Sequence, residues 1–525
     1  MAKFLPVGVS DFRQLIEGNF LYVDKTAYIY ELVRPPQAFY FLSRPRRFGK
    51  SLLVSTLREL FQAQQKLFKG LWIEGSDWAW QPHPVVMFDF SGIANETPRD
   101  FRDSLLRKLR QIGERYRLSL DDAPSIPEAV VWLISRIAEQ TGERVVVLMD
   151  EYDKPLIEHL GRGEEHLQIA RENRDILRQF MGAFKAAEVM AALRFVFITG
   201  ISKFSKVSLF SGLNNLEDLS MHEEYAALLG YEESEIETYF AEHLRSLARK
   251  LKLSVPEVMD KIREWYDGYR FSSADVKVYN PFSVLKALKE KEFGNYWFET
   301  ATPAFLIDLI KAQNYPIPEL ESLRIAPSQF TTYDLEYLSL EPLLFQTGYL
   351  TIQDYDGLLY ELGYPNREVK ISFTEFLYNQ LVPIGERGIR AQYRLLAAYL
   401  VKGELEAFVT TVNRMLAAIP YVHIQGQDEH YYHTVFYLML TAGGIAVHTE
   451  VLTSRGRMDM AVEAGNRVYV IELKCNQSAE EALHQIKERG YADRYRGKGR
   501  KVILLGINFD TGRREVSEWK VEELS

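Results

Sequence analysis

Four short apolar runs recur between residues 39 and 199, and longer amphipathic stretches separate them. The runs are FYFLS (39–43), VVMFDF (85–90), VVVLM (145–149) and RFVFIT (194–199). Strands that alternate with helices in this way join into a parallel sheet, and helices cover the sheet because each crossover passes over one of its faces. The pattern therefore predicts an α/β fold for this part of the chain, with a parallel sheet flanked by helices.

The length of 525 residues predicts more than one domain, because single hydrophobic cores stop growing near about 250–300 residues. The alternating pattern ends near residue 225, and a second pattern of helices and strands begins after residue 410. We therefore predict three parts, with boundaries at 1–225, 226–409 and 410–525.

The middle part has a mostly helical pattern from residue 225 to about residue 340. The segments 343–352 and 358–364 then flank Asp356-Gly357, a two-residue turn signal that predicts a β-hairpin. Helices followed by a hairpin are similar to a winged-helix module, although this is an analogy at the level of the fold.

Charge and composition limit the compartment and the partners. The chain has a single cysteine, Cys475, and no stretch that approaches the roughly 20 apolar residues needed to cross a bilayer. We therefore expect a cytoplasmic protein without a membrane partner. Because the net charge is −9, any surface that binds nucleic acid must be local, and the arginines at 44–47 and the basic run 494–501 are the candidates.

Gly49-Lys50-Ser51 follows the first apolar run directly and begins an amphipathic helix. Backbone N–H groups at a helix N-terminus bind phosphates, a lysine reaches the β and γ phosphates, and a serine hydroxyl can ligate Mg²⁺. This context predicts a P-loop that binds ATP with Mg²⁺. The residues predicted to contact the nucleotide here are Arg46, Arg47, Phe48, Gly49, Lys50 and Ser51. Arg44 stands where the first glycine of a P-loop is expected, so the turn must be made differently.

Asp150 and Glu151 stand at the carboxyl end of the third apolar run. A carboxylate pair in this position can supply a Mg²⁺ partner, Asp150, and a base that orients water, Glu151. The fourth run ends at Thr199, which could contact the γ phosphate; Ser202 is the alternative. Lys203 or Lys206 could act on phosphate, or each could be an ordinary loop residue.

The C-terminal part has the order helix, three strands, helix, strand over residues 430–507, and the second helix is expected over residues 478–493. Gly465-Asn466 separates the second and third strands and predicts a two-residue hairpin turn. In that register, opposed residues have numbers that sum to 931, so Asp459 stands across from Glu472. Lys474 shares the face of Glu472 because strand side chains alternate in direction.

Two opposed carboxylates repel unless a cation lies between them. Oxygen ligands of this kind suit Mg²⁺ or Mn²⁺, which can polarise a phosphodiester and activate water. Lys474 could orient the nucleophile or stabilise the charge that develops on phosphate. The pattern favours a metal-dependent site over a charged surface hairpin, provided that no β-bulge shifts the register.

Four motifs in the first part resemble the AAA-ATPase-like family of bacteria and archaea over residues 3–225. They are YVDKT (22–26), RPRRFGKS (44–51), MDEYD (149–153) and TGISK (199–203). The resemblance implies a P-loop ATPase. It also implies that the arginine-bearing loop is usual in the family.

Residues 410–515 resemble the PD-(D/E)XK nuclease superfamily, in the motifs GRMD (456–459) and IELK (471–474) and in Gln485 followed by Tyr491. The resemblance implies a restriction-endonuclease-like αβββαβ domain. It implies metal binding by Asp459 and Glu472, catalytic assistance by Lys474 and support from Gln485. It also implies an acidic metal ligand from the first helix, for which Glu429 is our choice and Glu450 the alternative.

Together the two resemblances imply an ATPase domain that controls metal-dependent cleavage of nucleic acid, with DNA preferred over RNA. The alternative is an ATP-responsive sensor or scaffold whose nuclease-like domain binds nucleic acid or protein without cutting. ATP could also be bound without being hydrolysed. Proteins of this type often assemble, so a homo-oligomer is a further expectation.

Overall fold

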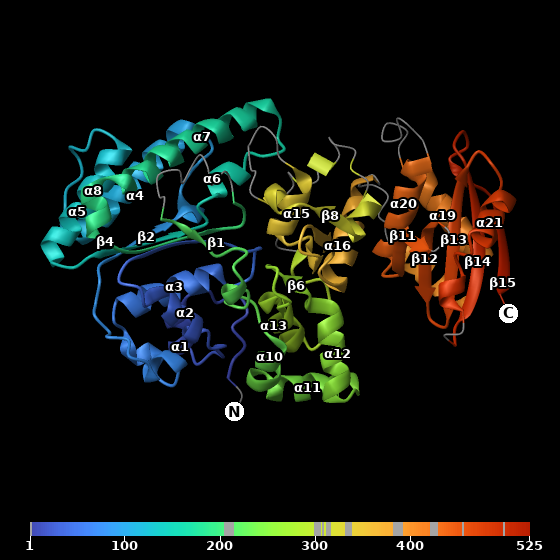
Figure 1. Cartoon of the computed structure of the whole chain (residues 1–525), viewed down its shortest axis with the longest axis horizontal. Coiled ribbons are helices and arrows are strands. Elements are labelled where there is room, and N and C mark those ends of the chain that lie inside the picture. The colour runs from blue at the N-terminus through green and yellow to red at the C-terminus, as the bar shows by residue number, and fades with distance from the viewer. Residues whose placement is uncertain are drawn as a thin grey trace. The chain divides into compact units, whose positions relative to one another are not determined.

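The computed structural model describes residues 3–203, 215–298, 306, 309–310, 315, 317–330, 339–381, 392–419, 429–453, 456–496 and 499–524 (Figure 1). The chain divides into two compact units. Unit one comprises residues 1–313 and 324–366, and unit two comprises residues 314–323 and 367–525. Among the described residues, no helix is long and apolar enough to cross a membrane.

A five-stranded parallel sheet forms the centre of the first part of unit one. Its spatial order is β2-β3-β4-β1-β5, and every neighbouring pair is parallel. The strands are β1 (Ala38–Ser43), β2 (Val85–Asp89), β3 (Val145–Asp150), β4 (Leu193–Gly200) and β5 (Glu217–Asp218). The first four coincide with the apolar runs, so the predicted parallel sheet is confirmed. Strands β1, β3 and β4 are buried along their whole length, as expected of strands that helices cover on both faces.

Helices cover both faces of this sheet (Figure 1). One face carries α4 (Pro98–Arg115), α5 (Ile126–Thr141), α7 (Glu164–Gly182) and α8 (Ala187–Ala192), and the other carries α1 (Phe12–Glu17), α2 (Thr26–Val33) and α3 (Lys50–Phe61). The short helix α6 (Lys154–Ile157) follows β3. Thr97 and Ser125 cap α4 and α5 by accepting hydrogen bonds from backbone N–H groups, and a proline lies in the first two positions of each helix. These caps satisfy donors that a helix start leaves unpaired.

The middle region of unit one begins with four helices that share a hydrophobic core. They are α10 (Glu233–Tyr239), α11 (Ala241–Leu251), α12 (Val255–Tyr266) and α13 (Pro281–Glu290). The short strands β6 (Tyr269–Arg270) and β7 (Lys277–Val278) pair between α12 and α13. A second group follows and comprises β8 (Leu323–Ile325), α15 (Leu340–Thr347), β9 (Thr351–Tyr355) and β10 (Tyr360–Gly363).

The predicted hairpin is present, but its first strand begins later than the sequence suggested. Residues 340–347 form a helix, whereas we expected 343–352 to be a strand. An apolar run that is buried on all sides has no periodicity that separates strand from helix. Gly348, with a φ of +88°, ends the helix in the left-handed conformation, and β9 pairs with β10 beyond it.

Unit two contains a mixed five-stranded sheet in the order β11-β12-β13-β14-β15. Strands β13 and β14 are parallel, and the other neighbours are antiparallel. The elements are α16 (Arg367–Leu381), α18 (Tyr393–Lys402), α19 (Leu405–Ala417), α20 (Glu429–Ala442), β11 (Ala446–Thr453), β12 (Gly456–Ala464), β13 (Arg467–Cys475), α21 (Ala479–Glu488), β14 (Lys501–Asp510) and β15 (Glu515–Leu524). The predicted αβββαβ order is confirmed.

Two features of unit two differ from the expectation. Helix α21 ends at Glu488, whereas the pattern suggested residues 478–493, because Gly490 adopts a φ of +63° shortly after the helix. Strand β15 was not predicted. It is an edge strand whose exposed face is rich in charge, so it lacks the apolar run by which the other strands were recognised.

Candidate nucleotide and metal sites

The predicted P-loop joins β1 to α3. The loop covers residues 44–49, and α3 begins at Lys50. Gly49 caps this helix with a φ of +93°, a conformation that side chains with a Cβ rarely adopt. The loop therefore brings the backbone to the start of α3 as an anion-binding loop requires.

Lys50 is buried, with an exposed fraction of 7%. Its Nζ donates hydrogen bonds to the carbonyl oxygens of Arg44 and Pro45, each at 2.9 Å. Burial lowers the pKa of Lys50, and the carboxylates of Asp150 and Asp153 oppose that shift. The ammonium group that we expected to reach phosphates is thus held by the loop itself.

Asp150 and Glu151 lie beside the start of α3. The side chain of Asp150 is hydrogen-bonded to Ser51, and burial raises its pKa despite that bond and the nearby Lys50. Glu151 has a φ of +52°, a strained conformation for this residue type that is common at functional sites. Burial and the charge of Asp150 raise the pKa of Glu151. Ser51 and Asp150 are therefore placed together, as a shared Mg²⁺ would require.

A cleft of about 590 Å³ opens beside these residues. Its volume lies in the range of small-molecule sites. Part of its lining comes from segments whose sequence gave no signal, namely the N-terminal residues and α13. The lining includes Pro6, Val9, Arg46, Arg47, Gly49, Lys50, Ser51, Glu151, Asp153, Tyr231, Pro281 and Phe282.

Three predicted residues have side chains that face protein rather than this cleft. Phe48 is 1% exposed and packs against other aromatic rings, so only its backbone could contact a nucleotide. The hydroxyl of Thr199 is buried and donates to the carbonyl of Leu42 at 2.7 Å, which ties β4 to β1. Lys203 forms an ion pair with Asp218. Lys206 lies outside the described residues.

Asp153 is a residue of this region that the sequence reasoning missed. It lines the cleft and is almost fully buried. Its Oδ2 accepts hydrogen bonds from the backbone N–H groups of Ile201 and Ser202, at 2.9 and 2.7 Å, and from the Ser202 hydroxyl at 2.8 Å. Gly200 leaves no room for a Cβ, which would lie 2.5 Å from Asp153 Oδ1. Asp153 therefore fixes the loop after β4 against the loop after β3, and its place in MDEYD was the available signal.

The second candidate site lies on the hairpin of β12 and β13. Five residue pairs, from Ala464 and Arg467 to Met460 and Ile471, follow the register that sums to 931, so that register is confirmed. Regular pairing ends there. At the next position the Asp459 carboxylate accepts a hydrogen bond from the backbone N–H of Leu473 at 2.8 Å. Asp459 thus stands beside the start of the Glu472–Lys474 segment.

Glu472 is the centre of this site and has an exposed fraction of 1%. Its Oε1 accepts a hydrogen bond from the side-chain amide of Gln485 and lies 3.6 Å from Lys474 Nζ. Its Oε2 is buried and has no hydrogen-bond partner among the described residues. Burial and the charge of Asp459 raise the pKa of Glu472 to about 8, and Lys474 opposes the shift.

These residues fit a divalent cation. A buried carboxylate oxygen without a partner costs free energy, and a bound cation removes that cost. Asp459 and Glu472 would hold the ion, and both supply the oxygen ligands that Mg²⁺ and Mn²⁺ prefer. When bound, such an ion polarises a phosphodiester and lowers the pKa of a bound water.

The additional acidic ligand is not settled by the described residues. They contain no group of three or more His, Cys, Asp or Glu side chains close enough to hold a metal ion. Glu429 is exposed at the first position of α20, and it does not join Asp459 and Glu472 in such a group. The pairs Thr449–Met460 and Val451–Met458 bracket Glu450, whose backbone is therefore in register with Asp459. The side chain of Glu450 lies outside the description.

The basic run 494–501 is largely ion-paired in unit two. Arg500 pairs with Glu463, and Lys501 pairs with Glu523 at 2.8 Å. Arg496 lies 3.6 Å from Asp493, and the guanidinium of Arg494 covers the ring of Tyr495. A phosphate backbone would have to compete with these partners.

The sequence matches two family models. The description "Predicted AAA-ATPase" applies to residues 6–210, and the description "PD-(D/E)XK nuclease superfamily" applies to residues 427–519. A relative from Azotobacter chroococcum mcd 1, called "Uncharacterized protein in vnfD 5'region", is 39% identical over 535 residues. That alignment covers 99% of each chain.

Two solved structures are also similar to this chain. The Aeropyrum pernix ORC1 protein in complex with DNA is 13% identical, and the match covers 67% of this chain and 91% of that one with a TM-score of 0.24. Cdc6p from Pyrobaculum aerophilum is 10% identical, and the match covers 68% and 93% with the same TM-score. TM-scores this low do not establish a common overall fold.

Proposed function

This chain belongs to the AAA-ATPase-like family and carries a C-terminal domain of the PD-(D/E)XK nuclease superfamily, and from this premise we propose that ATP bound in the first domain regulates metal-dependent cleavage of nucleic acid by the last. The proposal keeps the three-part division at 1–225, 226–409 and 410–525. DNA is the preferred substrate over RNA, and the cytoplasm is the expected compartment.

The observation that carries the nuclease half is the buried Glu472. Its unpartnered Oε2 and the neighbouring Asp459 form an anionic pair that a divalent cation would neutralise. Lys474, close to Glu472, would stabilise the charge that develops on the phosphate. Gln485 would hold the Glu472 carboxylate in place through its hydrogen bond.

The ATPase half rests on the loop between β1 and α3. Backbone N–H groups of Arg46, Arg47 and Phe48 would contact phosphates together with Gly49, and Lys50 would reach the β and γ phosphates. Ser51 and Asp150, which are hydrogen-bonded to each other, would share a Mg²⁺. Glu151 would orient the attacking water if ATP is hydrolysed. Thr199 would act indirectly, by fixing β4 beside β1.

A cleavage assay tests the nuclease half. Full-length protein is incubated with single-stranded and double-stranded DNA and RNA, in Mg²⁺ or Mn²⁺. We expect cleavage that requires the metal and that falls about a thousandfold in Glu472→Ala, because the substitution removes a metal ligand. Glu488→Ala is the matched control, since Glu488 is an exposed residue of α21. Equal cleavage by the wild type and Glu472→Ala would contradict the proposal.

Two observations favour the alternative of a binding module that does not cut. The described residues supply two carboxylates to the site rather than a group of three, and the basic run is ion-paired. A sensor or scaffold of this kind would retain nucleic acid or protein without cleavage in any metal. Metal-dependent cleavage lost in Glu472→Ala would exclude it.

A further inference from the structure

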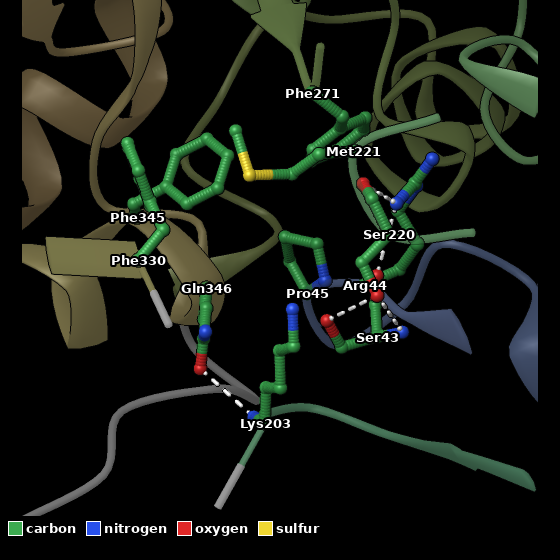
Figure 2. A pocket seen from close by; sticks show the side chains of 10 residues that line it. All are labelled: Ser43, Arg44, Pro45, Lys203, Ser220, Met221, Phe271, Phe330, Phe345 and Gln346. Carbon is green, nitrogen blue, oxygen red and sulfur yellow. Dashed lines mark hydrogen bonds between the residues drawn. The ribbon is translucent and has the colours of Figure 1, made fainter. Parts of the chain in front are cut away.

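Arg44, the first residue of the P-loop, is buried to an unusual degree for arginine, with an exposed fraction of 2%. Its Nη1 donates to the carbonyl oxygens of Ser43 and Ser220, at 3.0 and 2.7 Å, and its Nη2 donates to that of Tyr225 at 3.3 Å. Figure 2 shows Arg44 beside Ser43 and Ser220 at one side of a small pocket. Burial lowers the pKa of Arg44 to about 9, so it stays charged at neutral pH.

The backbone of the same residue holds the P-loop lysine. The carbonyl groups of Arg44 and Pro45 accept both hydrogen bonds that Lys50 donates. The Arg44 side chain is fixed at three carbonyls, and the proline ring restricts the next residue. The two carbonyls that face Lys50 are therefore held in place by contacts on the opposite side of the chain.

Aromatic side chains of the middle region pack against this loop. The Arg44 guanidinium lies 4.2 Å from the ring centroid of Phe271. Phe48, at the other end of the loop, packs edge-on against Tyr269 and Phe271, with centroid distances of 4.8 and 5.4 Å. Phe271 thus contacts both ends of the loop.

The residues between these ends contact the middle region as well. The buried Trp297 donates from its Nε1 to the carbonyl of Arg46 at 3.1 Å. The Arg47 guanidinium lies 4.8 Å from the Phe282 ring. Pro45 lies so close to Gly348 that a Cβ on that glycine would be 2.7 Å from the proline ring. Every residue from 44 to 48 therefore touches a residue beyond the parallel sheet.

We propose that Arg44 is a positioning residue that couples nucleotide binding at Lys50 to the packing of the middle region. The Lys50 ammonium has three N–H groups, and two of them donate to the carbonyls of Arg44 and Pro45. To donate to both the β and the γ phosphate, Lys50 must therefore release at least one of these carbonyls. The backbone of the loop then moves relative to its anchors at Phe271 and Trp297. This inference rests on the proposed binding of ATP, and it assigns the middle region as the part that responds to it.

Replacing Arg44 by glycine distinguishes two roles for this residue. Arg44 either anchors the loop or only stands in the place of the first P-loop glycine. The substitution restores the glycine that the pattern expects at this position. If Arg44 only replaces that glycine, the variant binds nucleotide as well as the wild type or better. If Arg44 is the anchor, the variant loses three hydrogen bonds and the Phe271 contact, and binding weakens.

The affinity is measured on the full chain with a non-hydrolysable ATP analogue, adenylyl imidodiphosphate, and Mg²⁺. We expect Arg44→Gly to weaken binding by about tenfold or more, since hydrogen bonds from a charged group contribute at least that factor. The affinity of Arg44→Lys should lie between those of the wild type and Arg44→Gly, because lysine keeps the charge but lacks the planar guanidinium group. The control is Arg117→Gly, an exposed arginine with a φ of +58°, where glycine fits without strain. Unchanged or tighter binding in Arg44→Gly would overturn the proposal.

Hydrogen exchange tests the coupling itself, with each variant saturated by the analogue. The expected result is a change of backbone exchange in 269–271 and around Trp297 in the wild type and in Arg117→Gly. In Arg44→Gly the change should be lost, and in Arg44→Lys it should be partly restored. If Arg44→Gly shows the same change of hydrogen exchange as the wild type, the coupling is refuted, even if Arg44 is needed for nucleotide affinity.

Two controls keep this test separate from the proposed function. If the wild type binds no nucleotide, the ATPase proposal fails, and the anchoring is still decided by nucleotide-free exchange. In that case 269–271 must exchange faster in Arg44→Gly than in Arg117→Gly, and equal rates overturn the anchoring. If circular dichroism shows that Arg44→Gly does not fold, Arg44→Lys and Phe271→Leu are measured in its place, with the same expected loss of response.

Discussion

The candidate nucleotide site and the candidate metal site satisfy their buried charges in opposite ways. The Lys50 ammonium is held by two carbonyls of its own loop, at 2.9 Å each. The Glu472 carboxylate has one oxygen without a partner and a second acid, Asp459, nearby. A nucleotide that contacts Lys50 through both its β and γ phosphates must therefore replace at least one existing hydrogen bond, whereas a metal ion would remove an existing free-energy cost. The comparison indicates that metal binding should stabilise its unit strongly, while nucleotide binding should give a smaller net gain.

Among the changes in binding affinity, the largest should come from Lys50. Lys50→Ala removes the group expected to contact the β and γ phosphates, and we expect ATP affinity to fall about a hundredfold. It also leaves the carbonyls of Arg44 and Pro45 without their donor, so the free energy of unfolding of unit one should fall by about 1–3 kcal/mol. Calorimetric titration with ATP and Mg²⁺ and urea denaturation measure the two effects. If Lys50→Ala binds ATP with the affinity of the wild type, Lys50 does not contact the nucleotide phosphates.

The next effect concerns the acid beside Glu472. Asp459→Asn removes a negative charge, so the affinity for Mn²⁺ should fall about 10- to 100-fold. The same change should lower the pKa of Glu472, because the charge of Asp459 is one cause of its raised value. Titration with Mn²⁺ at several pH values measures both. Unaltered Mn²⁺ binding in the variant would show that Asp459 is not a ligand.

The stability of unit two and its affinity for Mn²⁺ should both depend on pH through Glu472. The pKa of Glu472, about 8, lies above the value of about 4.3 expected in the unfolded chain, so the folded unit binds this proton more tightly. Its contribution to stability is present below the unfolded pKa and is lost as the pH rises through about 8. Mn²⁺ binds the deprotonated carboxylate, so its affinity should increase over this range.

Thermal denaturation of unit two without metal should therefore give a midpoint that falls from about pH 5 to about pH 9. The fall should be smaller in Glu472→Gln, which cannot lose a proton, and Mn²⁺ should reverse it in the wild type only. The same slope in both proteins would show that Glu472 is not the group that titrates.

The smallest effect should come from the acid on the first helix. Glu429 is exposed, so Glu429→Ala should leave cleavage within about twofold of the wild type. Glu450→Ala should reduce cleavage more, because Glu450 is in register with Asp459. Initial rates of the two variants, measured side by side in Mn²⁺, decide between them. A larger loss in Glu429→Ala would restore the first-helix residue as the additional ligand.

Local signals were sufficient for much of the fold. Each strand of the parallel sheet except β5 was an apolar run, and Gly465-Asn466 fixed the register of β12 with β13 because a two-residue turn allows one pairing. The contact between Gln485 and Glu472 agrees with the family resemblance. The catalytic and binding roles of these residues remain predictions.

Contacts between segments that are distant in the sequence could not be predicted from local sequence signals. The Arg44 side chain is buried because it contacts Ser220, Tyr225 and Phe271. No sequence pattern near residue 44 indicates these contacts. Helix α15 was taken for a strand because burial on all sides removed its periodicity. Asp153 was missed because its partners follow a different strand.

The central claim, that ATP in the first domain controls cleavage by the last, is tested by one rate measurement. Initial rates of Mn²⁺-dependent DNA cleavage are compared with and without ATP in the wild type and in Lys50→Ala. The account predicts that ATP changes the rate of the wild type and leaves the rate of Lys50→Ala unchanged. A wild-type rate that is independent of ATP, or an equal response in both proteins, would contradict it.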